Sequence, residues 1–243
     1  MKKFHWLFIF IFFIISGLLL SFKIEYLKEI GLETLFLSIG LFIIFILNHK
    51  NILLPTNLRN INRTTILYIL ALSFLATLLT TYILCLFSYF NIGYFNYSKD
   101  SNKITLIEIL ITLLFSPICE EILFRAGLLS LLIKKIPLHL SILIQGIIFA
   151  FLHGLSFKTI TFYTALVGGI ILGYIFYYTR SVIASILCHF MYNLMGLFMG
   201  ILVFKITTLF TLVFCIFLCL LCLLIIFFCI REIKSSSKPL SSH

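Results

Sequence analysis

Two adjacent glutamates, Glu120 and Glu121, lie with Arg125 inside a stretch of otherwise apolar sequence. The motif reads Ser-Pro-Ile-Cys-Glu-Glu-Ile-Leu-Phe-Arg, with Ile-Thr-Leu-Leu-Phe before it and Ala-Gly-Leu-Leu after it. A charged side chain near the centre of a bilayer costs about 2.5–3.5 kcal/mol on insertion scales. Charged residues retained in such a segment therefore indicate a functional site.

Helical spacing predicts different roles for the two glutamates. Glu121 and Arg125 are four residues apart and share a helix face, so they can form an internal ion pair. Glu120 is turned about 100° away from Glu121 around the helix and is poorly placed to share that arginine. The spacing thus predicts a structural role for Glu121, in the ion pair, and a chemical role for Glu120.

Two further apolar segments carry histidines. His153 ends one of them, with Phe149 one turn before it, and His189 and Asn193 project together from another. A carboxylate can take a proton from water, and a neutral imidazole can orient that water or hold a metal ion that activates it. A carboxamide N–H and a second imidazole can donate to the developing oxyanion. These residue types are sufficient for hydrolysis of an amide bond.

The order and spacing of these groups resemble the CPBP family of membrane proteins. The motifs are Glu120-Glu121-x-x-x-Arg125, Phe149-x-x-x-His153 and His189-x-x-x-Asn193. The family comprises the type II CAAX prenyl endopeptidases and the Abi proteins, which act in bacteriocin processing or immunity. The resemblance covers residues 104–200, and the other segments match only as membrane helices.

This resemblance implies an intramembrane endopeptidase, a hydrolase of a family often labelled metalloprotease. The catalytic residues that it implies are Glu120, His153, His189 and Asn193. The residues that would support the site are Glu121, Arg125 and Phe149. Glu120 would act as general base beside His153, and His189 and Asn193 would stabilise the oxyanion.

The resemblance leaves the metal content of the site open. A catalytic zinc site takes three protein ligands and a water, which His153, His189 and Glu120 could provide. A metal-free site in which Glu120 and His153 activate water uses the same residues. We therefore assign no certain cofactor, keep Zn²⁺ as the candidate metal, and favour a site without tightly bound zinc.

Composition indicates that these motifs belong to a membrane protein. Of the 243 residues 62% are hydrophobic and the mean hydropathy is +1.21, whereas soluble domains are about 45–50% apolar. The net charge of +10 falls in short basic clusters between apolar runs, as orientation signals and lipid contacts do, so we expect no nucleic-acid partner. The seven cysteines lie almost wholly in apolar runs, which is typical of small buried side chains and not of a disulfide framework.

The apolar runs predict an all-α fold, a polytopic membrane helical bundle with about eight transmembrane helices. The expected spans are residues 4–22, 30–47, 65–90, 104–133, 138–152, 160–178, 182–204 and 207–230. Pro117 should kink the fourth span one turn before the glutamates. Gly168, Gly169 and Gly173 in the sixth span are small enough to let a neighbouring helix approach closely.

Lysine and arginine are distributed unequally between the two sides of the predicted bundle. Their excess on one side predicts a multi-pass protein of the cell membrane with both termini in the cytoplasm. We expect three regions along the chain. They are N-terminal transmembrane helices at 1–103, a CPBP/Abi-like catalytic core at 104–204, and a last helix with a disordered cytoplasmic tail at 205–243.

Three classes of function fit these features. The first is an endopeptidase acting on a membrane-associated peptide or protein, prenylated or not. The second is a non-catalytic immunity or scaffold protein that binds a bacteriocin-like peptide or a sensor protein. The third is a transporter or proton relay, since intramembrane Glu and His also mark ion paths. The absence of an internal repeat argues against a transporter. The sequence leaves the oligomeric state open.

Overall fold

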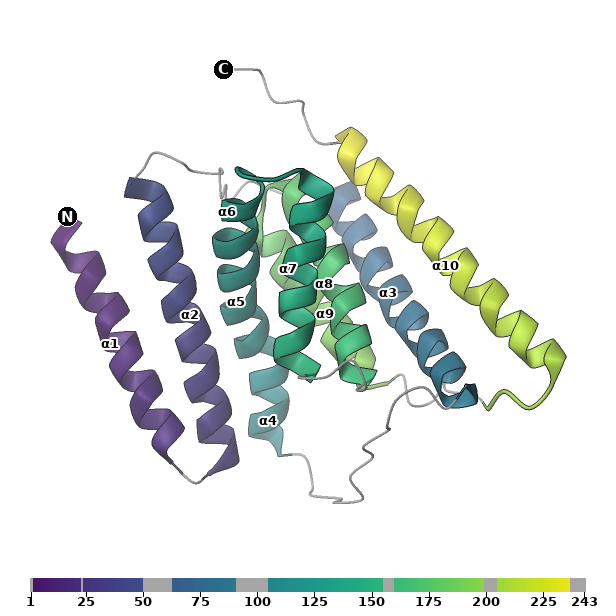
Figure 1. Cartoon of the computed structure of the whole chain (residues 1–243), viewed down its shortest axis with the longest axis horizontal. Helices are drawn as coiled ribbons and strands as arrows, with labels where there is room; N and C mark the ends of the chain where they lie inside the picture. Colours follow the sequence, from purple (N-terminus) through teal and green to yellow (C-terminus); the bar gives the residue numbers. More distant parts are fainter. Residues whose placement is uncertain are drawn as a thin grey trace. The chain divides into compact units, whose positions relative to one another are not determined.

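The structure is a computed structural model that describes residues 2–22, 24–49, 63–90, 105–154, 160–198 and 205–236. Regular secondary structure in these residues is entirely helical, as predicted (Figure 1). The uninterrupted helices are α1 (Lys2–Ser21), α2 (Glu25–His49), α3 (Arg63–Tyr89), α7 (Leu138–Gly154), α8 (Ile160–Thr179), α9 (Val182–Gly196) and α10 (Leu209–Ser236).

The helix that carries the two glutamates is continuous from 106 to 132 but changes type along its length. Its segments are α4 (Leu106–Leu110), the π-helix η1 (Ile111–Phe115), α5 (Ser116–Glu121), the π-helix η2 (Ile122–Leu129) and α6 (Ser130–Leu132). Pro117 stands in the first turn of α5, directly after η1. The disturbance expected at this proline, which lacks an N–H to donate, thus takes the form of a π-helical segment on its N-terminal side.

A capping box starts this composite helix. The Glu108 N–H donates to the Thr105 hydroxyl at 3.3 Å, and the Thr105 N–H donates to the Glu108 carboxylate at 2.7 Å. Each residue thereby satisfies a backbone donor that has no partner within the helix. Glu108 is therefore explained by the helix start and is not needed for the chemistry of the site.

With the composite helix counted once, the described residues form eight helices, which agrees with the number of predicted spans. By length and composition, four described helices could cross a membrane: Leu27–Asn48, Arg63–Tyr89, Thr161–Thr179 and Leu209–Ser236. Shorter apolar helices lie at Ile9–Ser21, Leu138–Gly154 and Val182–Gly196. Large apolar side chains cover the outside of α10, among them Phe210 and Phe227. The chain is a polytopic helical bundle of a multi-pass membrane protein.

The structure corrects three of the predicted helix ends. The helix of the seventh span, α9, ends at Gly196, eight residues before the predicted end. The second span begins at Glu25, five residues before the predicted start, so its connection to α1 is much shorter than expected. The last helix continues to Ser236, because Ile233 is buried in the core and the Lys234 ammonium lies 5.8 Å from the centre of the Tyr178 ring. The predicted disordered tail beyond this helix, and the polar connections at 51–62 and 91–104, lie outside the described residues.

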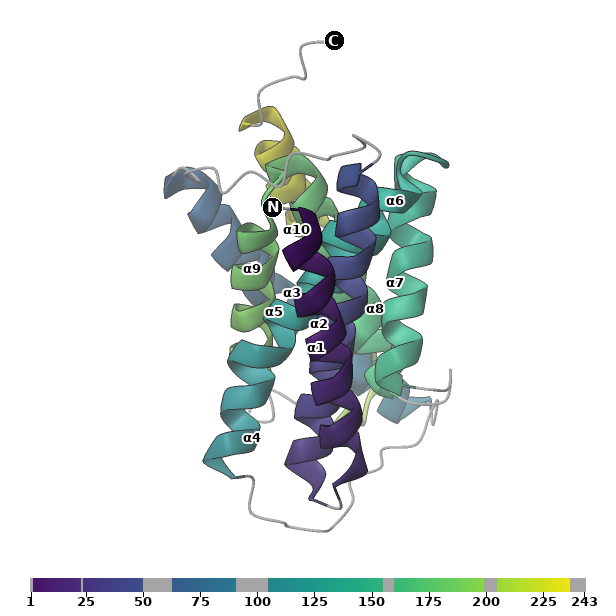
Figure 2. The ribbon, with the colours of Figure 1, turned by 90° about the vertical axis from the view of Figure 1, so that its left-hand side faces the viewer.

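The chain divides into two compact units, each described by itself. Unit 1 consists of Met1–Asn57 and Ser98–Ser141, and unit 2 of Leu58–Tyr97 and Ile142–His243. In unit 1, α2 packs against α1 and against the α5 and η2 segments (Figure 2). In unit 2, α3 packs against α8, α9 and α10.

The core of unit 2 combines apolar packing with a few satisfied polar groups. The Tyr192 hydroxyl donates to the Thr164 carbonyl at 3.2 Å and to the Thr80 hydroxyl at 3.4 Å, which ties α9 to α8 and α3. Ser73 on α3 donates to the carbonyl oxygens of Ile69 at 2.8 Å and Cys188 at 3.2 Å. All seven cysteines are buried and none forms a disulfide, which confirms the prediction that they are packing residues.

Candidate active site

The ion pair predicted between Glu121 and Arg125 is present. Arg125 Nη1 lies 2.8 Å from Glu121 Oε1, and both side chains are 0% exposed. The guanidinium carbon also lies 5.9 Å from the centre of the Phe124 ring. Two opposite charges are thus held together where neither contacts solvent.

Helix α2 packs on the helix that carries this ion pair. The Phe36 ring meets the Phe124 ring edge to face, with the ring centroids 6.3 Å apart. Gly40 permits the close approach, because a Cβ atom at this position would lie only 2.8 Å from Leu123 Cα. The backbone of α2 therefore rests directly on η2, the segment that carries Arg125.

We expect Gly40→Ala to destabilise unit 1, because the added methyl group meets backbone atoms of Leu123 that cannot rotate away. Overpacking of this kind costs about 1–3 kcal/mol. The matched control is Gly17→Ala on α1, where nothing lies within 4 Å of the added Cβ. Thermal melting of the purified variants should show a lower midpoint for Gly40→Ala alone. Equal melting of the two variants would contradict the close packing of α2 on η2.

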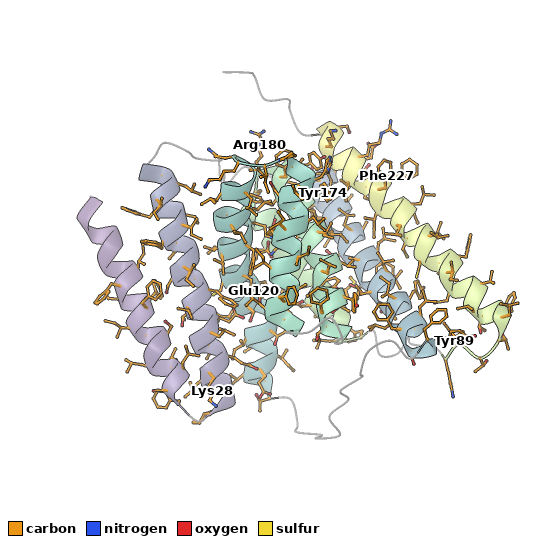
Figure 3. The ribbon with its side chains drawn as sticks, viewed as in Figure 1. Lys28, Tyr89, Glu120, Tyr174, Arg180 and Phe227 are labelled. Carbon is orange, nitrogen blue, oxygen red and sulfur yellow. The ribbon has the colours of Figure 1, made fainter. Side chains whose placement is uncertain are left out.

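Figure 3 labels Glu120 on the composite helix. It lies in α5, which stands between η1 and η2 along the chain. Its side chain is 4% exposed and its neighbour Cys119 is fully buried. Single π-helical turns inside α-helices occur frequently at functional sites. The composite helix thus contains two buried acidic side chains, Glu121, which pairs with Arg125, and Glu120, which lies next to it in sequence.

A third buried glutamate, Glu33 on α2, was missed by the sequence analysis. Its side chain is 7% exposed. The carboxylates of Glu33 and Glu120 both interact electrostatically with the thiol of Cys119. Glu33 carries no recognisable motif, and the signal that could have found it is an acidic residue within a predicted span. A third buried carboxylate therefore lies on α2, the helix that packs against α5.

In unit 2, Phe149 brings the two histidines together. Its ring centroid lies 4.3 Å from that of His153 and 6.0 Å from that of His189. Phe149 is buried, His189 is buried, and His153 is exposed. The Phe149 ring thus packs against both imidazoles, that of His153 at the end of α7 and that of His189 within α9.

The hydrogen bond of His153 indicates its tautomer. Nδ1 lies 2.9 Å from the carbonyl oxygen of Phe149, and a carbonyl oxygen can only accept. Nδ1 therefore carries the hydrogen, and in the neutral ring Nε2 is the acceptor nitrogen. An imidazole with this tautomer can accept a hydrogen bond from water or ligate a metal ion through Nε2.

Close packing of α7 on α8 fixes the direction of these helices. A Cβ atom on Gly169 would lie 3.2 Å from Gly146 Cα, and one on Gly173 would lie 3.0 Å from a methyl carbon of Ile142. Lower-numbered residues of α7 thus contact higher-numbered residues of α8, so the two helices are antiparallel. The predicted role of the sixth-span glycines in close approach is confirmed for these two.

A tight turn joins α8 to α9. Arg180 in this turn has φ 52°, in the left-handed region, and the Ser181 hydroxyl caps α9 by accepting from the Ala184 N–H at 3.3 Å. The turn makes α9 antiparallel to α8 and therefore parallel to α7. Since Phe149 contacts His189, residues of α7 and α9 that differ by 40 in number lie at the same level. His153 is level with the half-buried Asn193.

The predicted site residues form two groups. Unit 1 contains Glu120, Glu121 and Arg125, and unit 2 contains Phe149, His153, His189 and Asn193. The convergence of Glu120 with the histidines stays a prediction, and so does their use as a zinc site. Among the residues that the structure describes, no group of three or more His, Cys, Asp or Glu is arranged to hold a metal ion.

Comparison with known families identifies the segment that carries the motifs. Residues 102–195 match the family described as "Type II CAAX prenyl endopeptidase Rce1-like". This range contains every predicted site residue. No curated protein and no solved structure matches the chain.

Proposed function

We propose that the chain is an intramembrane endopeptidase, on the premise that residues 102–195 match the family of type II CAAX prenyl endopeptidase Rce1-like proteins. The observation that carries the proposal is the second buried carboxylate of the motif. Glu121 is committed to Arg125 at 2.8 Å, yet Glu120 is also buried, at 4% exposure. An acidic side chain is expensive in an apolar segment and marks a functional site.

In the proposed reaction Glu120 accepts a proton from a water molecule, whose oxygen attacks the carbonyl carbon of the scissile peptide bond. His153 orients this water through Nε2, because its Nδ1 donates to the Phe149 carbonyl. His189 and Asn193 donate hydrogen bonds to the oxyanion. Glu120 then returns the proton to the leaving nitrogen as the C–N bond breaks.

Three of the same residues would be the ligands of a metal ion. Their donor types, two imidazoles and one carboxylate, match those of catalytic zinc sites, so His153, His189 and Glu120 would hold Zn²⁺. When bound, this ion would polarise the scissile carbonyl and lower the pKa of the attacking water. The orientation of His153 by Phe149 serves either chemistry, since it leaves Nε2 as the acceptor or ligand atom.

The substrate in this proposal is a membrane-associated peptide or protein. A site carried by apolar helices is reached most directly by a chain that is itself in or on the bilayer. Both termini of the enzyme would lie in the cytoplasm, as the distribution of lysine and arginine indicates.

Mass spectrometry of membrane peptides tests the proposal. Membranes containing the wild-type protein or Glu120→Gln are incubated in H₂¹⁸O, and the released peptides are compared. We expect peptides that appear only with the wild type, each with ¹⁸O in its newly formed C-terminal carboxyl group. Identical peptides in both samples would show that the chain is not the protease and would favour a scaffold or immunity role.

A further inference from the structure

Two polar side chains in unit 2 are buried without the partners that such groups require. Gln145 and Ser185 are both 0% exposed. Neither amide atom of Gln145 nor the hydroxyl of Ser185 has a hydrogen-bond partner in the described part of the chain. An unsatisfied polar group in a membrane protein is costly, because no bulk water reaches the hydrocarbon region to compensate it.

Other buried hydroxyl groups of unit 2 are satisfied locally. Ser73 and Thr77 on α3 donate to the carbonyl oxygens four residues earlier in their own helix, at 2.8 Å and 2.7 Å. Ser185 also lies within a helix and could do the same, but its hydroxyl makes no such bond. Its lack of a partner is therefore not a general feature of hydroxyl groups in this bundle.

The register of the helices places the two groups at the same level. Gln145 and Ser185 differ by 40 in number, as do Phe149 and His189, so they lie level on parallel helices one turn before that contact. Gly173 of the intervening α8 is at the same level, since a Cβ atom there would lie 3.3 Å from Gln145 Oε1. A side chain on Gly173 would crowd the carboxamide.

We propose that Gln145 and Ser185 form a subsite that binds one peptide unit of the substrate backbone. We call it the Gln145–Ser185 subsite; it rests on the proposed function and extends it to substrate recognition. A carboxamide supplies both a donor and an acceptor, which a peptide unit needs for its own C=O and N–H. The subsite carries no charge, so it suits a neutral segment of the substrate.

The position of the subsite sets which part of the substrate it meets. It lies four residues before His189 along α9, which corresponds to about 6 Å along the helix. An extended peptide advances about 3.3–3.6 Å per residue. The subsite therefore binds the backbone about two residues from the scissile bond.

Peptide capture by the full chain tests this subsite without requiring turnover. Glu120→Gln is placed in lipid nanodiscs and incubated with a library of uncharged, membrane-partitioning peptides, and the bound peptides are quantified. Two variants are compared in this background, Gln145→Met, which has a similar volume without the amide, and Ser185→Ala. The matched control is Ser73→Ala, a buried hydroxyl of the same unit that already has a partner.

We expect each subsite variant to reduce capture about tenfold, as the loss of one or two hydrogen bonds predicts. The control should bind like its parent. Melting temperatures without peptide should not fall for Gln145→Met, since it removes an unsatisfied group. Unchanged capture in both variants would overturn the proposal, as would an absence of capture by any protein. If capture depends on Gln145 but the wild-type protein cleaves no peptide, only the proposed function is refuted.

Discussion

Replacement of Glu120 by glutamine is expected to abolish turnover while leaving the protein folded. Glutamine keeps the shape and hydrogen-bonding capacity of the side chain but cannot accept the proton of the attacking water. Loss of a general base lowers the rate by about 10²–10⁴-fold. Turnover of a peptide from the wild-type digest, measured with both purified proteins, gives this ratio.

Stability is the internal control for this variant. Glu120 is 4% exposed, so Gln removes a buried charge without creating a cavity, and the melting temperature should stay near that of the wild type. An inactive Glu120→Gln protein that melts far below the wild type would indicate a structural role for the carboxylate. Full activity would exclude Glu120 as the base.

Replacement of Glu121 by glutamine should have the opposite effect. It leaves the guanidinium of Arg125, which is 0% exposed, without its carboxylate at 2.8 Å. Removal of one partner of a buried ion pair costs about 3–5 kcal/mol in soluble proteins. We expect poor accumulation and early melting, with activity lost in proportion to the folded fraction. Expression level, melting temperature and activity per folded molecule are the measurements.

A second substitution distinguishes the role of the Glu121–Arg125 ion pair from that of the neighbouring Glu120. Glu121→Gln with Arg125→Met removes both charges and should recover part of the lost stability. Arg125→Met added to Glu120→Gln should lower stability, because it leaves Glu121 as an uncompensated buried charge. If Glu121→Gln stays folded but inactive while Glu120→Gln still cleaves, the roles of the two glutamates are exchanged.

Local sequence information predicted the number of helices and the ion pair. Apolar runs long enough to span a bilayer specify helices, because a spanning segment must satisfy its own backbone. The Glu121–Arg125 contact followed from a spacing of four residues within one helix. The hydrogen bond between His153 and the Phe149 carbonyl likewise joins residues one turn apart.

Features that depend on contacts between helices were not predictable in this way. Glu33 lies near Cys119 only because α2 packs on α5 and η2, where Gly40 permits the approach. The π-helical segments on either side of α5 have no sequence signature of their own. The level arrangement of Gln145 and Ser185 requires the register of α7 and α9, which the contact between Phe149 and His189 sets.

The central claim is that Glu120 and His153 meet at one site, and cysteine cross-linking tests it most directly. The pair Glu120→Cys with His153→Cys is treated in membranes with a short bifunctional methanethiosulfonate. Trypsin then cleaves at the exposed Lys134 and Lys135 between the two positions, and mass spectrometry detects the joined peptides. The control replaces Ile118, which is 41% exposed, instead of Glu120. The account predicts linked peptides for positions 120 and 153 and none for 118 and 153. Linkage at 118 without linkage at 120 would contradict it.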